Sequence, residues 1–152
     1  NGKDEAEFYL SVNPGEPLKP LGSVASGGEI SRVMLAVKTV LADEEDTPTL
    51  IFDEIDTGIS GITAGKVGDR LRLIGKSRQV ICITHLPQIA AAADHHFLIR
   101  KKAEGTSVRT DVEMLDEAAS VEELARLLGG ANVTERVMES AKELKELAKC
   151  ER

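Results

Sequence analysis

Three short groups of residues in this chain have the types and the order that nucleotide hydrolysis requires. The turn Ser26-Gly27-Gly28-Glu29 opens a predicted helix, the acidic pair Asp53-Glu54 ends an apolar run, and His85 follows a second apolar run. Glycines let a phosphate approach the backbone closely, and exposed N–H groups at a helix start attract anions. The three groups therefore predict a site for a nucleoside triphosphate.

Each of the acidic and imidazole groups has its own expected chemistry. Asp53 can hold Mg²⁺, usually through water, because magnesium prefers hard oxygen ligands and keeps its hydration shell. Glu54 can orient the attacking water or take its proton, which is worth ~10²–10⁴ in rate. His85 can donate a hydrogen bond to a terminal phosphate. Plainer alternatives remain: Ser26 as an ordinary N-cap, the acidic pair as a loop cap, and a structural histidine.

The chain carries no Gly-x-x-x-x-Gly-Lys-[Ser/Thr] phosphate loop. The run from Gly61 to Val67 imitates one, but it is one residue short, lacks the hydroxyl residue for Mg²⁺ and follows the acidic strand. We expect a helix start with a surface lysine at Lys66. The chain is thus expected to hold half of a nucleotide-hydrolysing domain.

The elements that must position these residues follow from periodicity and turn signals. A strand over 7–12 and a Pro/Gly loop over 13–22 precede a helix that begins at Ser26. Apolar residues recur along that helix every three or four positions and predict a buried stripe, made of Ile30, Val33, Met34, Val37, Val40 and Leu41. Strands over 49–53 and 79–84, with a helix over 62–74 between them, form a βαβ unit. Both strands are apolar throughout and are expected to be fully buried, as in parallel sheets.

The rest of the chain predicts a hairpin and a helical tail. A short helix over 87–93 is followed by strands over 97–101 and 108–115, with a turn at Glu104-Gly105 and with His95-His96 as a strand start rather than a metal site. Two helices follow, the first capped by Ser120 with Glu123 and the second by Asn132 with Glu135. We favour a docked helical pair over a partner-binding helix.

Composition limits the classes of function. The 152 residues suit a single α/β domain with a mostly parallel sheet flanked by helices. A net charge of −7 and 3% aromatic residues argue against a nucleic-acid surface on this chain by itself, and Lys101-Lys102 reads as a solvated strand end. Cys82 and Cys150 read as free thiols of a reducing cytosol. No membrane span or signal peptide is expected, and the start reads as a cut inside a longer protein.

At these positions the chain resembles the ABC ATPase superfamily. The turn 26–29 is similar to its signature motif, 50–54 to its Walker B strand, Asp56 to its D-loop and His85 to its switch histidine. Transporter-type members continue with proline after the glutamate, whereas this chain has Ile55. The run 55–61 instead resembles the RecN family of bacterial DNA repair proteins, which are relatives of the SMC proteins. So do the runs 13–18, 24–29 and 84–90, and the likeness covers nearly the whole chain.

The resemblance implies the C-terminal lobe of an SMC-type ATPase head, acting in DNA double-strand break repair and recombination in the cytoplasm at the nucleoid. A separate N-terminal lobe, joined through a coiled coil, would supply Walker A, so this chain alone is expected to be inactive. Two heads would sandwich ATP and Mg²⁺. Ser26, Gly27 and Gly28 of one head would touch the γ-phosphate held by the other, with Glu29 completing the motif. Asp53 would support the metal.

The same resemblance assigns Glu54 as the base, Asp56 as the residue that signals across the dimer, and His85 as the γ-phosphate sensor. Two alternatives remain open. The chain could be a non-catalytic interaction module that completes a partner's nucleotide site, or a part of another SMC- or ABC-type ATPase. A Walker A motif and heptads upstream of Asn1 in the parent sequence would favour the ATPase lobe over the module.

Overall fold

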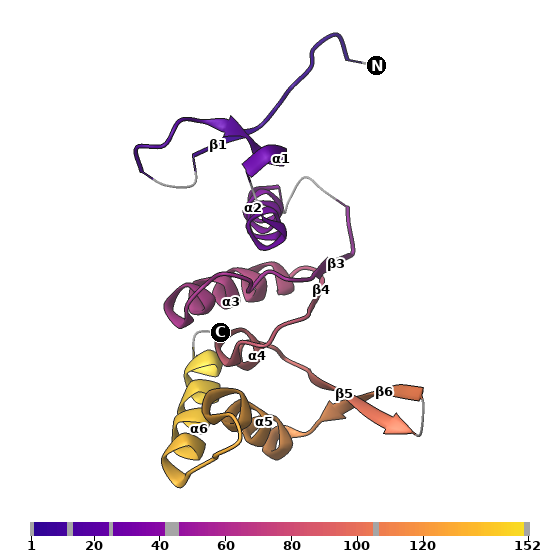
Figure 1. Cartoon of the computed structure of the whole chain (residues 1–152), viewed down its shortest axis with the longest axis vertical. Coiled ribbons are helices and arrows are strands. Elements are labelled where there is room, and N and C mark those ends of the chain that lie inside the picture. The colour runs from indigo at the N-terminus through magenta and orange to yellow at the C-terminus, as the bar shows by residue number, and fades with distance from the viewer. Residues whose placement is uncertain (1, 12–13, 25, 42–45, 105–106, 151–152) are drawn as a thin grey trace. The chain divides into compact units, whose positions relative to one another are not determined.

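The computed structural model describes residues 2–11, 14–24, 26–41, 46–104 and 107–150. Its α and β elements follow one another as in Figure 1 and confirm the expected α/β class. The chain divides into two compact units, Asn1–Ile59 with Leu73–Thr84, and Ser60–Arg72 with His85–Arg152. Each unit is described by itself, and the expectation of a single domain stays a prediction.

The first unit begins with a small antiparallel pair. Strand β1 (Tyr9–Leu10) pairs with β2 (Lys19–Pro20), and the four-residue helix α1 (Leu21–Val24) follows at once. The predicted strand over 7–12 is therefore shorter than expected, and the predicted loop contains the partner strand. The Leu21 N–H donates to the Phe8 carbonyl over 2.8 Å and fixes this corner.

Helix α2 (Gly27–Val40) confirms the predicted helix start, but not its buried stripe. Ile30, Met34 and Val40 are exposed, and Leu35, which lies outside the predicted stripe, is buried. The spacing of the apolar residues was sufficient to form a helix. It did not determine burial, since Val33 and Val37 of the same stripe are only half-buried.

Strands β3 (Thr49–Phe52) and β4 (Gln79–Cys82) form the expected parallel pair, in the register Thr49↔Gln79 to Phe52↔Cys82. The prediction that both strands are fully buried is wrong. Leu50 and Phe52 are buried, whereas Ile51 between them is 67% exposed and Ile81 opposite it is exposed as well. Since neighbouring residues of a strand point to opposite faces, one face is packed and one is open. Ile51, Ile81 and Ile83 are the outer face of this pair.

The second unit starts with the main part of helix α3 (Gly61–Gly75). Lys66 is exposed near its start, which confirms a helix start with a surface lysine instead of a phosphate loop, and Val67 and Leu71 of the same helix are buried. Helix α4 (Pro87–Ala91) follows, and Gly68 of α3 lets the two helices approach: a Cβ there would lie 3.3 Å from the Gln88 carbonyl oxygen.

Strands β5 (His96–Glu104) and β6 (Ser107–Leu115) form the predicted hairpin, and its turn at residue 105 lies outside the described residues. His96 begins β5, as expected. Lys101 and Lys102 are exposed, and Lys102 pairs with Asp111 at 2.8 Å. The cations of this hairpin are thus in part neutralised on the same strands.

The C-terminal tail is the predicted pair of helices, α5 (Glu117–Gly129) and α6 (Glu135–Cys150), which lie side by side in Figure 1. Both predicted caps are wrong. Asp116 caps α5 by accepting from the Ala119 N–H, because the helix begins directly after β6, and Ser120 lies buried inside it. Thr134 replaces Asn132 at the start of α6, where its hydroxyl accepts from the Val137 N–H.

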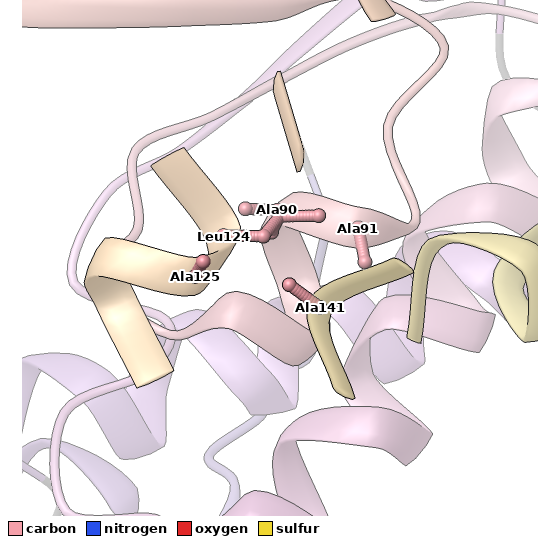
Figure 2. Packing of buried hydrophobic residues seen from close by; sticks show 5 residues of the cluster. All are labelled: Ala90, Ala91, Leu124, Ala125 and Ala141. Carbon is pink, nitrogen blue, oxygen red and sulfur yellow. The ribbon is translucent and has the colours of Figure 1, made fainter. Parts of the chain in front are cut away.

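Small residues close the core of the second unit. Figure 2 shows Ala90 and Ala91 of α4, Leu124 and Ala125 of α5 and Ala141 of α6 meeting in one cluster. Alanines at these contacts let helices pack closely, and Leu124 fills the remaining volume. Within the described ranges, no helix combines the length and the apolar character that crossing a membrane would demand.

Candidate nucleotide site

The glycine turn is held by a reciprocal pair of hydrogen bonds at the start of α2. The Ser26 N–H donates to the Glu29 carboxylate over 2.7 Å, and the Glu29 N–H points back at the Ser26 hydroxyl at 3.4 Å. The backbone hydrogen bond from Ser26 lowers the pKa of the Glu29 carboxyl, so this group stays charged. Glu29 thus holds the turn in shape, and the two glycines follow directly on an ordered cap.

Both glycines lie against the residues that follow β3. A Cβ at Gly27 would be 2.8 Å from Oε2 of Glu54, and a Cβ at Gly28 would be 2.9 Å from the carbonyl oxygens of Glu54 and Thr57. At Gly28 the close atoms belong to the backbone, so a Cβ there would force the loop to shift, whereas a Cβ at Gly27 would only displace the end of the Glu54 side chain. The turn and the acidic pair therefore lie in direct contact, although 25 positions separate Gly28 from Asp53 in the sequence.

Glu54 has an unusual backbone. Its φ of 56° places a residue with a Cβ in the left-handed region, the one such case among the described non-glycine residues. A conformation of this kind costs about 1–3 kcal/mol and persists only where the surroundings hold it. The Thr57 N–H donates to the Glu54 carbonyl over 3.1 Å and closes a tight turn there. The adjacent Asp53 accepts the Glu54 N–H on Oδ1 at 2.9 Å.

Two polar side chains of α2 tie this loop to the helix. The Ser31 hydroxyl donates to the Asp53 carbonyl at 3.0 Å. Nη1 of Arg32 donates to the carbonyls of Ile55 at 3.0 Å and Thr57 at 2.8 Å. Sequence reasoning missed both residues. The available signal was a polar pair one turn after the glycines, between apolar neighbours of the predicted stripe.

Asp56 points inward and not to solvent. It is 4% exposed, and its Oδ2 accepts the Thr84 hydroxyl at 2.6 Å. This bond links the loop after β3 to the segment after β4, where Ile83 N–H also donates to Phe52 O. A role for Asp56 as a contact across a dimer stays a prediction.

His85 directly follows Thr84 in the sequence and is exposed. It belongs to the second unit, so its distance from the acidic pair is not described. Cys82, at the end of β4, is no nucleophile. Burial, together with the charges of Asp56 and Asp53, raises the pKa of its thiol to about 12. The thiol therefore stays protonated near neutral pH.

The structure thus brings together Ser26, Gly27, Gly28, Asp53 and Glu54 in the first unit. Within the described residues, no three His, Cys, Asp or Glu side chains gather as a metal cage. An exposed carboxylate such as Asp53 nevertheless suits Mg²⁺, which usually takes one or two protein carboxylates and completes its shell with water and phosphate oxygens.

Comparison with known proteins gives a consistent set of relatives, although no protein-family model matches the chain. The DNA repair protein RecN of Halalkalibacterium halodurans is 53% identical over 97% of this chain and 26% of that protein. RecN of Vibrio cholerae is 49% identical over 94% of this chain and 26% of that protein. RecN of Streptomyces coelicolor is 43% identical over 100% of this chain and 27% of that protein. The chain spans about a quarter of the length of these relatives.

A solved structure from a study of ATP-driven dimerization and DNA stimulated activation of SMC ATPases is also similar. It is 25% identical, with a TM-score of 0.46 over 74% of this chain and 68% of that chain. The relatives all share one description, DNA repair protein RecN. The chain belongs to the RecN family and corresponds to the C-terminal part of those proteins.

Proposed function

We propose that this chain is the C-terminal lobe of an ATPase head that hydrolyses ATP between two copies of its parent protein. One observation carries the proposal: the signature glycines and Glu54 lie in contact, with 2.8 Å between the Cβ position of Gly27 and the glutamate Oε2. The turn and the acidic pair of one head therefore share one surface, and two heads that meet there would place the turn of each beside the acidic pair of the other. The reacting groups would then share one rim of the parallel strands.

Each residue has a stated task in this proposal. Gly27 and Gly28 present backbone N–H groups at the start of α2 to the γ-phosphate of ATP held by the second head. The Glu29 carboxylate keeps Ser26 and the first turn in place. Glu54 takes a proton from the attacking water. Its carboxylate must first leave the space beside Gly27, because a phosphate there would repel it.

Mg²⁺ would neutralise charge on the phosphates, and Asp53 is the carboxylate that would hold it. Asp56 keeps the segment after β4 in position through Thr84. His85, the next residue, would hydrogen-bond the γ-phosphate. The lobe carries no phosphate loop, so we propose that it does not turn over ATP by itself.

The proposed partners are the N-terminal Walker A lobe and coiled coil of the same protein, a second head bound through ATP, and DNA held by the full assembly. The outer face of the parallel pair supports a covering partner, because Ile51, Ile81 and Ile83 lie exposed on it. Relatives named DNA repair proteins support a role in DNA repair, and we propose that this role is double-strand break repair and recombination at the nucleoid.

Glu54→Gln in the full-length parent tests the proposal. It should bind ATP normally, lose hydrolysis by a factor of ~10²–10⁴ and accumulate as an ATP-bound dimer, because amide nitrogen cannot accept the proton. Light scattering on a size-exclusion column, with and without ATP, measures the dimer. Glu117→Gln, at an exposed carboxylate far along the sequence, is the matched control. Normal ATP turnover by Glu54→Gln would remove the residue from the role of base.

A further inference from the structure

We propose that Arg32 is the positioning residue for Glu54, and that it acts by clamping the loop after the acidic pair onto helix α2. Its Nη1 lies 3.0 Å from the Ile55 carbonyl oxygen and 2.8 Å from that of Thr57. One terminal guanidinium nitrogen carries two N–H groups, so it can serve both carbonyls at once. The inference rests on the proposed function, which makes Glu54 the base.

The clamp acts where the backbone needs support. Glu54 sits at a φ of 56°, a conformation that side chains rarely adopt, and the carbonyls bound by Arg32 lie one and three residues after it. Ser31 adds a third tie from the same turn of α2, at the Asp53 carbonyl. The strained residue is thus anchored on both sides to one rigid element.

The same clamp joins the base to the glycine turn. A Cβ at Gly28 would meet Nη1 of Arg32 at 3.0 Å as well as the carbonyl oxygens of Glu54 and Thr57. Helix α2, Arg32 and the acidic loop therefore pack without space between them. Arg32 lies four residues after Gly28, the glycine that would meet phosphate. A movement of α2 on nucleotide contact would be transmitted to Glu54 through Arg32.

Arginine suits this position better than lysine. Its guanidinium is planar, always charged and holds its donors in a fixed fork, whereas a lysine ammonium is a flexible point donor. Arg32 is half-buried, and both of its hydrogen bonds to the loop go to neutral carbonyls, so the task that we assign to it is to orient the backbone.

The test uses the full-length parent with Arg32→Gln, Arg32→Lys and, as a matched control, Arg70→Gln at an exposed arginine of α3. Arg32→Gln should lower kcat for ATP on the order of 100-fold, since a misplacement of about 1 Å costs that much. The KM for ATP should stay within about twofold, because substrate binding does not use this loop. Arg32→Lys should recover part of the rate, and Arg70→Gln should leave it unchanged.

A second measurement separates positioning from general damage. In the Glu54→Gln background, Arg32→Gln should lower the residual rate by no more than about twofold, because a residue that acts through the base has nothing left to position. Three results would overturn the inference. The first is a normal kcat in Arg32→Gln, and the second is a multiplicative loss of rate in the double variant. The third is loss of the folded circular-dichroism signal in both Arg32→Gln and Arg32→Lys. If Glu54→Gln itself hydrolyses normally, the proposed function fails instead.

Discussion

The two units of this chain treat their apolar residues differently. In the second unit, Leu124, Ala125 and Ala141 have no exposed surface, and three helices close around them (Figure 2). In the first unit, which holds the candidate site, Ile51 and Ile81 lie exposed on the parallel strands, and Met34 and Val40 lie exposed on α2. The helices of the second unit close a core of their own, whereas the unit with the site presents apolar surface, as does the β5–β6 hairpin with Phe97 and Val108.

This difference indicates which unit depends on a partner. A monomeric protein rarely exposes a continuous apolar face, and burying such a face is worth about 25 cal/mol for each Å² removed from water. We therefore expect the helices α4, α5 and α6 of the second unit to hold their structure by themselves, and the first unit to gain stability when its outer face is covered. The predictions below test this contrast through hydrogen exchange, which reports local stability in each unit separately, and through unfolding midpoints.

The largest effect is expected at the closed core. Leu124→Ala should lower the free energy of opening of α5 and α6 by about 2–5 kcal/mol, because it leaves a cavity that its alanine neighbours cannot fill. Amide hydrogen exchange in α5 and α6 measures this free energy of opening. Leu147→Ala, at an exposed leucine of α6, should change the same free energy by less than about 0.5 kcal/mol. Equal effects of the two variants would contradict a closed core.

The next effect lies in the unit with the site. Gly28→Ala should destabilise it by about 1–3 kcal/mol, since the new Cβ meets two backbone carbonyl oxygens that cannot turn away. Gly65→Ala in α3 has open space around its Cβ and should instead stabilise its helix by about 0.5–1 kcal/mol. Urea unfolding of the pair measures the difference. Equal stability of the two variants would show that the glycine turn does not pack on the acidic loop.

The sequence was sufficient for the features that local chemistry determines. Ser26 and Glu29 stand three residues apart, and the capping box they predict is present. The same kind of signal misled at Ser120, because Asp116 offers an equally good cap immediately after β6 and the Ser120 hydroxyl binds His96. Asp116 and Ser120 are both good N-cap residues, and the helix begins after the first of them because strand β6 ends at Leu115.

Long-range contacts were beyond the sequence for a different reason. Arg32 and Ile55 are 23 residues apart, and no periodicity relates a helix residue to a loop carbonyl. The burial of Ile51 depends on what covers its face, which its apolar character does not specify. Residue types therefore predicted the glycine turn, the acidic pair and their helix and strands, but not the clamp between them.

A smaller effect is expected where the two strand ends are linked. Thr84→Val removes the hydroxyl that donates to the buried Asp56 carboxylate and should cost about 1.5 kcal/mol. Thr84→Ser keeps the hydroxyl and should recover most of that stability. Exchange of the amides in β3 and β4 gives the measurement. No loss in the valine variant would mean that Thr84 does not fix Asp56.

The smallest effect is a pH dependence in the second unit. Burial, followed by the charge of Lys145, lowers the pKa of His96, while Glu123 acts in the opposite direction. The unfolded chain therefore takes up a proton before the folded one, so stability should fall as the pH drops through the ordinary value of 6.5. His96→Phe should remove this part of the dependence, and His95→Phe should retain it. Unfolding midpoints that rise toward acid pH would contradict the sign.

The central claim is that the glycine turn of one molecule serves the nucleotide held by another. Two variants of the full-length parent test it, Ser26→Arg at the turn and Glu54→Gln at the base, each expected to be inactive alone. Mixed in equal amounts, they should recover about a quarter of the normal ATP turnover, because about half of the dimers are mixed and each holds one intact site. A mixture that stays as inactive as its components would contradict the account.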